Sequence, residues 1–244
     1  MPLVTPALVG IILAAGTVAG ALGATLGIGG GIFLVPLLTL GLGMPIGVSA
    51  AISLTTVIST SSTVSAGRSG SHLINVRLGL LLEVATAAGS LLGGITAQHM
   101  DALLLERIFA FVTVGVAITT LSRINRSNAV PGDALDCGWL GGRYVDAESG
   151  GVVSYRVRRV PLALVASFLA GNVSSLLGIG GGVIKVPVLN AWCGVPLRAA
   201  AATSAFMIGV TAAAGAFIYF GNGQLVPALA AAAVLGVRAG ASTG

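Results

Sequence analysis

Charged residues are scarce in this chain, at 8% of 244 residues, whereas a soluble domain has roughly a quarter. This deficit excludes an ordinary soluble fold. Hydrophobic residues account for 55% and the mean hydropathy is +1.02. Apolar runs near 20 residues recur, long enough to cross a hydrocarbon core of about 30 Å as helices. The alternating segments of about ten residues that build a lipid-spanning barrel are missing. Because helices satisfy their own backbone inside a bilayer, we predict an all-α polytopic membrane protein.

Motifs of enzyme chemistry are missing as well. The sequence has no His-Glu-x-x-His, no nucleophile elbow and no Gly-Lys-Ser/Thr after its glycines, and it lacks the spacing of a dinucleotide fingerprint. Its two cysteines, Cys137 and Cys193, have neither metal-ligand nor pairing spacing. The arginines behind the net charge of +5 lie in short connections and one loop, not on a stacking platform. We therefore expect no enzyme, no cofactor, no metal and no nucleic-acid partner.

What the sequence does contain is an internal repeat, which is read before other features. The segment 26–36, Leu-Gly-Ile-Gly-Gly-Gly followed by Val-Pro at its end, returns 151 positions later as 177–187. The register extends to flanking positions. Gly43-x-Pro45 matches Gly194-x-Pro196, and Ala50-Ala51-x-Ser53 matches Ala201-Ala202-x-Ser204. Since the repeating unit is about half the chain, we predict two homologous halves.

The halves are expected to be a first transmembrane repeat in residues 1–122 and an incomplete second repeat in residues 161–244. The expected spans are residues 7–26, 28–43, 46–66, 78–98 and 102–122, then 161–177, 179–193, 196–220 and 224–240. The second span is short and carries Pro36, which indicates a broken or re-entrant helix. The fifth span finds no partner after residue 240, so we expect either a truncated chain or one with nine spans.

A hydrophilic loop, residues 123–160, joins the halves. The runs 139–145 and 152–158 are β-prone and flank a turn sequence, which predicts a hairpin. An isolated hairpin is marginal in water, so we expect it to lie against the membrane domain. It is either a regulatory or docking element or, as we favour, a linker whose charges hold it on one side of the membrane.

Arginines in short connections predict the orientation of the spans. Arg68 and Arg77 flank the loop after the third span, and the central loop carries arginines at positions 123, 126, 143, 156, 158 and 159. Placing these inside leaves Arg107 outside and requires an external N-terminus. If every segment crosses, five spans per half make the repeats inverted. If the glycine-proline segments are re-entrant and do not cross, each half has four full spans and the repeats are parallel. We favour inverted repeats.

The two glycine runs are the first candidate binding site. Each precedes an apolar segment whose helix would begin beside the glycines, and helix N-termini attract anions. The candidate glycines are Gly29, Gly30, Gly31, Gly180, Gly181 and Gly182. Close helix packing is the alternative, because small residues are common at membrane helix contacts. The duplication and the trailing prolines favour a site near the midplane, where transporters bind substrate.

Polar residues near the runs complete the prediction. Lys185 lies in an apolar run, where a lysine costs roughly 2.5–3.5 kcal/mol, so it either neutralises an anion or snorkels to the interface. Ser53, Thr203 and Ser204 are the best candidates for lining a cavity, although such hydroxyls often only bond to the backbone. Asn172 precedes the second run.

Glu83 in the fourth span is a further intramembrane ionisable residue. Such carboxylates mark ion pathways, so it could relay protons. We favour instead a pairing with Arg77 at the membrane interface.

The repeated motif, the Ala-Ala-Ala-Thr-Ser-x-Phe-Met-Ile-Gly-Val-Thr run at 200–211 and the Tyr-Arg-Val-Arg-Arg run at 155–159 resemble the TauE/SafE sulfite-exporter family. The resemblance implies an inner-membrane permease for sulfite, thiosulfate or organosulfonates without nucleotide hydrolysis. We therefore expect a secondary transporter working by alternating access in the lipid bilayer, with protons or another ion for coupling. A passive anion channel and a structural membrane protein are the alternatives, and the oligomeric state is left open.

Overall fold

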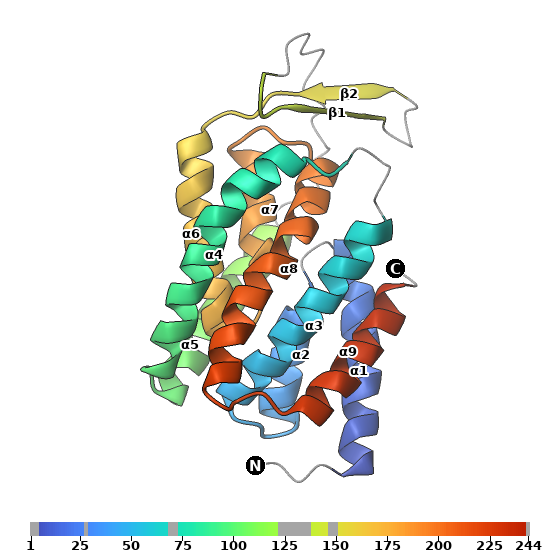
Figure 1. Ribbon diagram of the computed structural model, residues 1–244, viewed down its shortest axis with the longest axis vertical. Helices are drawn as coiled ribbons and strands as arrows, with labels where there is room; N and C mark the ends of the chain where they lie inside the picture. The colour runs from blue at the N-terminus through green and yellow to red at the C-terminus, as the bar shows by residue number, and fades with distance from the viewer. Residues whose placement is uncertain (1–4, 27–28, 68–72, 122–137, 146–150, 243–244) are drawn as a thin grey trace.

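The computed structural model describes residues 5–26, 29–67, 73–121, 138–145 and 151–242 (Figure 1). Helices make up most of these ranges, which confirms the predicted all-α class. Five of the described helices, α1, α3, α4, α6 and α8, are long and apolar enough to cross a membrane. The chain is therefore a multi-pass membrane protein.

The helices of the first half match the expected spans closely. They are α1 (Pro6–Leu26), α2 (Gly31–Pro36), the π-helical turn η1 (Leu37–Gly41), α3 (Ile46–Gly67), α4 (Val76–Gln98) and α5 (Ala102–Leu121). Those of the second half are α6 (Val160–Leu177), α7 (Gly182–Ala191), α8 (Leu197–Gly221) and α9 (Pro227–Ala241). The glycine-proline segments are short helices in both halves. The first of them is broken, because α2 gives way to η1 directly after Pro36, which has no backbone N–H to donate.

The main helix contacts join one half of the chain to the other. Helix α1 packs along α9, α4 packs along α6, and α3 packs against α8 at the centre. In the repeat α6 corresponds to α1, and α9 corresponds to α4. The α1–α9 pair and the α6–α4 pair are therefore repeat equivalents, and each takes one helix from each half. Figure 1 shows α1 running from the N-terminal end toward the hairpin end, while α6 runs away from the hairpin. This antiparallel relation is what inverted repeats require.

Glycines allow both outer pairs to approach closely. A Cβ on Gly93 of α4 would collide with the backbone oxygen of Asn172 on α6. A Cβ on Gly240 of α9 would collide in the same way with the oxygen of Thr17 on α1. Gly89 and Gly236 repeat the arrangement one turn earlier, so each interface carries small residues four apart, as membrane helix pairs commonly do.

The predicted hairpin is confirmed in the central loop. Strands β1 (Gly142–Val145) and β2 (Val152–Tyr155) are antiparallel, with Gly142 opposite Tyr155, and are shorter than the β-prone runs. Tyr144, Val153 and Tyr155 are buried in one cluster with residues of α4, α6, α7 and α8. Asn75, the N-cap of α4, donates its Nδ2 to the Leu140 carbonyl at 2.8 Å. The hairpin therefore lies against the membrane helices, as expected.

The arginines that the structure describes favour one end of the molecule. Arg77, Arg143, Arg156, Arg158, Arg159 and Arg198 belong to the hairpin, its connections or helix ends beneath it (Figure 1). Arg107 lies near the start of α5, at the opposite end. Arg68, Arg123 and Arg126 fall outside the described residues. The asymmetry is the one expected if the hairpin end faces the cytoplasm.

Candidate functional site

The two glycine runs meet at the centre of the helix bundle. A Cβ on Gly31 would lie 2.6 Å from the Gly178 carbonyl oxygen and 2.7 Å from Ser53 Oγ. Gly29 and Gly180 both approach the side chain of Val57 on α3 and have positive φ angles of 77° and 84°. Side chains would therefore push the runs apart, and all six candidate glycines, Gly29, Gly30, Gly31, Gly180, Gly181 and Gly182, are buried.

Both short helices begin at these glycines. Gly30 is the N-cap of α2, and its carbonyl accepts from the amides of Phe33 and Leu34 at 3.2 Å. Gly181 is the N-cap of α7, and its carbonyl accepts from Ile184 and Lys185 at the same distance. The sequence prediction that a helix starts directly after each run is confirmed. Of these two short helices, α7 has ten residues and therefore the larger dipole, whereas α2 has six.

Hydroxyl groups beside the runs differ in their partners. Ser53 Oγ donates to the Gly178 carbonyl at 2.6 Å, linking α3 to the second run. Its repeat counterpart, Ser204, is completely buried, yet its oxygen has no hydrogen-bond partner. Ser174 Oγ is likewise buried without a partner and lies beside Gly181. Because buried hydroxyls are nearly always hydrogen-bonded, these two groups are candidate ligand contacts.

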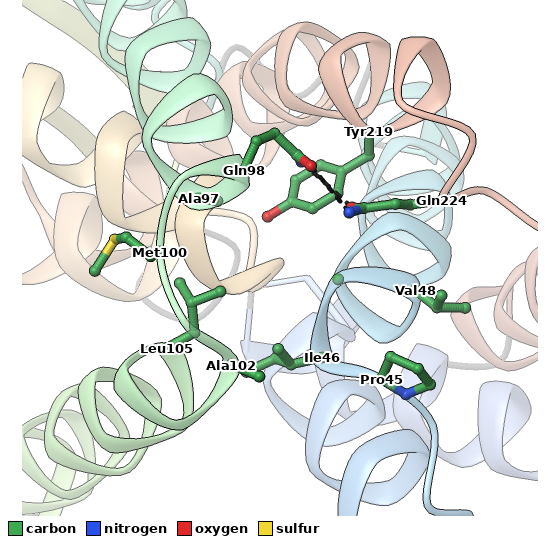
Figure 2. A pocket seen from close by; sticks show the side chains of 11 residues that line it. Pro45, Ile46, Val48, Ala97, Gln98, Met100, Ala102, Leu105, Tyr219 and Gln224 are labelled. Carbon is green, nitrogen blue, oxygen red and sulfur yellow. Dashed lines mark hydrogen bonds between the residues drawn. The ribbon is translucent and has the colours of Figure 1, made fainter.

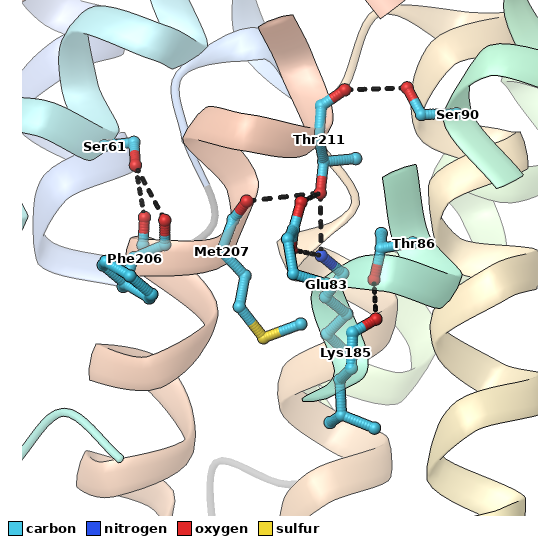
Figure 3. A network of polar contacts seen from close by, with 10 residues as sticks. Ser61, Glu83, Thr86, Ser90, Lys185, Phe206, Met207 and Thr211 are labelled. Carbon is cyan, nitrogen blue, oxygen red and sulfur yellow. Dashed lines mark hydrogen bonds and ion pairs between the residues drawn. The ribbon is translucent and has the colours of Figure 1, made fainter. Parts of the chain in front are cut away.

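Lys185 forms a buried polar cluster with residues of two other helices (Figure 3). Its side chain is about 1% exposed, and Nζ lies 3.6 Å from Glu83 Oε2 of α4. Nζ also donates to Thr211 Oγ1 of α8 at 3.0 Å, and Thr211 Oγ1 lies 2.8 Å from Glu83 Oε1. Glu83 and Lys185 are the buried charged residues of the part of the chain that the structure describes. We call Glu83, Lys185 and Thr211 the charged cluster.

The charged cluster excludes one of the two alternatives for Lys185 and corrects the predicted partner of Glu83. Lys185 does not snorkel to an interface, because it is buried and paired inside the bundle. Glu83 pairs with Lys185 rather than with Arg77, which is exposed near the start of α4. Burial of the carboxylate about two turns along α4 places it away from that interface.

The remaining predicted residues lie apart from the runs. Thr203 Oγ1 accepts from the Asn75 amide at 3.0 Å, so it anchors the start of α4 under the hairpin. Asn172 is half-buried, and its backbone packs on Gly89 and Gly93 of α4. Among the described residues, no hydrogen bond joins either of them to the glycine runs or to Lys185. The structure thus brings Ser53 and the backbone of Lys185 into contact with the glycine runs, but not Thr203 or Asn172.

The described residues form the walls of at least two cavities. One of about 230 Å³ lies between the start of α3, the α4–α5 connection and the end of α8 (Figure 2). Gln98 and Gln224 on its wall are hydrogen-bonded at 2.9 Å, and Tyr219 donates its hydroxyl to the Ser175 carbonyl at 2.9 Å. The other, of about 660 Å³, is an open groove between α3 and α9. It is lined by Thr55, Ile58, Ser59, Ser62, Thr63, Ala66, Val234, Arg238 and Ser242.

Comparison with known proteins agrees with this architecture. Residues 12–244 match the family described as sulfite exporter TauE/SafE. The chain is 24% identical over 241 residues to the "Probable membrane transporter protein YunE" of Bacillus subtilis, covering 96% of this chain and 86% of that protein. It is 24% identical over 215 residues to the "Probable membrane transporter protein MJ0441" of Methanocaldococcus jannaschii, covering 86% and 71%. No solved structure matches the chain.

Proposed function

The chain belongs to the TauE/SafE family of membrane transporters, and on that premise we propose that it is a secondary transporter of a small sulfur-containing anion. Sulfite, thiosulfate and organosulfonates are the candidate substrates. The observation that carries the proposal is the meeting of the two glycine runs at the bundle centre, one turn from a buried lysine.

The proposed site uses three kinds of positive or donating groups. The N-terminus of α7 supplies a partial positive charge. Lys185 supplies a full charge one turn further along the same helix. Ser174 and Ser204 supply buried hydroxyls that lack a partner in the structure. An oxyanion offers acceptor oxygens to each kind of group, whereas a cation would be repelled by the first two.

Transport is proposed to proceed by alternating access between halves formed by residues 1–122 and 161–244. Packing of α1 on α9 and of α4 on α6 supports inverted repeats. In many transporters one such repeat rocks against the other around a central site. The glycines and serines of the site are buried, so they lack access from either side in this state. At the end away from the hairpin, Tyr219 and the Gln98–Gln224 pair line the small cavity, and Tyr219 also donates to the Ser175 carbonyl just before the second glycine run. We propose that these residues close the pathway there.

The test is anion flux in liposomes containing the purified protein. A carrier gives saturable uptake and counterflow of labelled sulfite, thiosulfate or isethionate, whereas ohmic single-channel currents would identify a passive channel. The double variant Glu83→Gln/Lys185→Met keeps the bundle interior neutral and should abolish saturable flux. Leu34→Met, at the repeat position of Lys185, is the matched control and should transport normally. If the double variant binds and transports as the wild type does, the site assignment is wrong.

A further inference from the structure

We propose that Glu83 is a proton-binding residue that couples anion transport to protons. In the structure its carboxylate contacts Lys185 and Thr211. We infer that the transported oxyanion replaces the carboxylate at these two residues while Glu83 accepts one proton. The inference rests on the proposed function and adds a second substrate, the proton, together with the residue that binds it.

The geometry of the charged cluster favours exchange of one anion for another. Glu83 presents two oxygens, of which Oε1 faces Thr211 at 2.8 Å and Oε2 faces Lys185 at 3.6 Å. The second distance exceeds that of a hydrogen bond, and Oε2 has no hydrogen-bond partner. The carboxylate therefore satisfies only part of its bonding capacity. A sulfite or sulfonate offers the same kind of oxygen to the same ammonium and hydroxyl groups.

Charge balance in the bundle interior then requires a proton. Glu83 and Lys185 are opposite in charge, so the described interior is neutral without substrate. If an anion pairs with Lys185, the displaced carboxylate is a buried charge without a partner, which costs several kcal/mol in a low-dielectric interior. Protonation of one carboxylate oxygen removes that charge and leaves the ammonium unchanged. After the anion leaves, Glu83 loses the proton and the ion pair forms again.

The surroundings of Glu83 point to this residue as the proton acceptor. Among helices packed against α4, α6 has no titratable residue, α7 has Lys185, and α8 has Arg198 and Tyr219 near its opposite ends. From the hairpin, Tyr144 and Tyr155 share a core cluster with Leu78 and Leu82. On α4 itself, Arg77 is exposed. The described part of the chain thus places no second carboxylate beside Lys185.

The other half of the repeat offers an internal comparison. Leu34 occupies the position of Lys185, and Thr60 occupies that of Thr211. Thr60 Oγ1 donates to the Thr56 carbonyl of its own helix at 3.0 Å and contacts no charge. The charged cluster joins Glu83 of the first half to Lys185 and Thr211 of the second half, and no such cluster forms at Leu34 and Thr60. Thr60 therefore provides a matched control for Thr211.

The experiment measures accumulation in proteoliposomes with the membrane voltage held at zero. The probes are isethionate, sulfite and thiosulfate, and the coupled measurement uses whichever shows saturable counterflow. With one proton carried per anion, a gradient of one pH unit, acidic outside, should raise the wild-type accumulation ratio about tenfold. Glu83→Gln should give an accumulation ratio near one, whether its counterflow is fast or slow. Thr60→Val should behave as the wild type, and Thr211→Val should slow flux without changing the ratio.

The outcomes separate two failures. Absence of saturable counterflow for every probe overturns the proposed function and the inference with it. Counterflow in the wild type without pH-driven accumulation, or full accumulation by Glu83→Gln, overturns the coupling alone. If Glu83→Gln does not fold, Glu83→Asp serves instead and should slow flux while keeping the ratio. In lightly buffered detergent solution, the wild type should also take up about one proton per isethionate, sulfite or thiosulfate bound, after correction for the probe's own protonation.

Discussion

Lys185 and Glu83 are opposite charges in a neutral interior, and each is held by the other. Removing one partner of a buried pair leaves an uncompensated charge and typically costs about 3–5 kcal/mol, whereas replacing both can be nearly neutral. We expect Lys185→Met to lower the free energy of unfolding by that amount and Glu83→Gln/Lys185→Met to recover most of it. Thermal unfolding in detergent measures the difference. Equal losses in the single and double variants would show that the pair is not coupled.

Ser53 and Ser204 occupy equivalent repeat positions but differ in their hydrogen bonds. Ser53→Ala leaves the Gly178 carbonyl without this donor and should cost about 1–3 kcal/mol. Ser204→Ala removes a hydroxyl with no partner, so its stability should change by less than about 0.5 kcal/mol. Only Ser204→Ala should weaken sulfite binding without a loss of stability. Melting curves and equilibrium binding distinguish the two, and a large stability loss in Ser204→Ala would contradict the assignment.

The sequence predicts individual polar residues better than it predicts their partners. Lys185 stands out because a charge interrupts an apolar run. Its partners, Glu83 and Thr211, lie on other helices, and their contact depends on helix packing that no local pattern encodes. Arg77 lies nearer to Glu83 along the chain, which is why the sequence suggests it as the partner of Glu83. That prediction is wrong, because Glu83 pairs with Lys185. Thr203 shows the same limit, because its neighbour Ser204 faces a different environment on the same helix.

At the scale of helices, the outer pairs depend on backbone contact at glycines. Gly93→Ala places a methyl group against the backbone of α6 and should destabilise the protein by about 1–3 kcal/mol. A methyl group added at Gly10 of α1 would meet no heavy atom within 4 Å, so Gly10→Ala should gain up to about 1 kcal/mol from helix propensity. Detergent melting temperatures compare the two. A similar loss in both would show that packing is not the cause.

The hairpin packs over the α7–α8 connection, and Cys193 reports on that contact. Burial raises the pKa of the Cys193 thiol, an effect that Arg159 partly opposes. A raised pKa means less thiolate at neutral pH, so in a Cys137→Ser background Cys193 should react slowly with maleimide and faster as pH rises. Tyr155→Ala should loosen the hairpin and accelerate labelling. Unchanged kinetics in Tyr155→Ala would show that the hairpin does not shield this thiol.

The bounds of the helices follow from the sequence because glycine and proline mark them. Gly30 and Gly181 cap the short helices, and Pro36 precedes the π-helical turn. The π-helical geometry itself was not predictable, because Pro187 occupies the equivalent position inside α7 without causing it. A proline specifies a missing donor, and neighbouring contacts decide how the chain accommodates it.

At the scale of the whole molecule, duplication in the sequence predicts two homologous halves but does not say which helices pack together. The structure shows α1 beside α9 and α4 beside α6, so each of these pairs takes one helix from each half. The charge difference between the halves accompanies a difference in backbone, because α7 continues past Pro187 whereas α2 gives way to η1 after Pro36. The charged cluster is asymmetric, because the second half supplies Lys185 and Thr211 while the first half supplies Glu83. Proton coupling at one residue is compatible with this asymmetry.

The orientation of the molecule in the membrane decides which end opens to the outside. Arginines gathered at the hairpin end predict that this end is cytoplasmic. Exposed Asp101 and Asn222 lie in connections at the opposite end, while exposed Trp139 and Arg143 lie in the hairpin region. In a cysteine-free background, Asp101→Cys and Asn222→Cys should react with a membrane-impermeant maleimide in intact cells.

Trp139→Cys and Arg143→Cys should react only after the cells are permeabilised. That pattern would make the cavity beside Gln98 and Tyr219 the external entrance, so protons and anions would enter there under an inward gradient. The reverse pattern would put the hairpin outside and make the same cavity the cytoplasmic entrance. The residues of the site would be unchanged, because Glu83 and Lys185 are buried from both ends. Orientation thus sets the direction of coupling, and the charged cluster sets its existence.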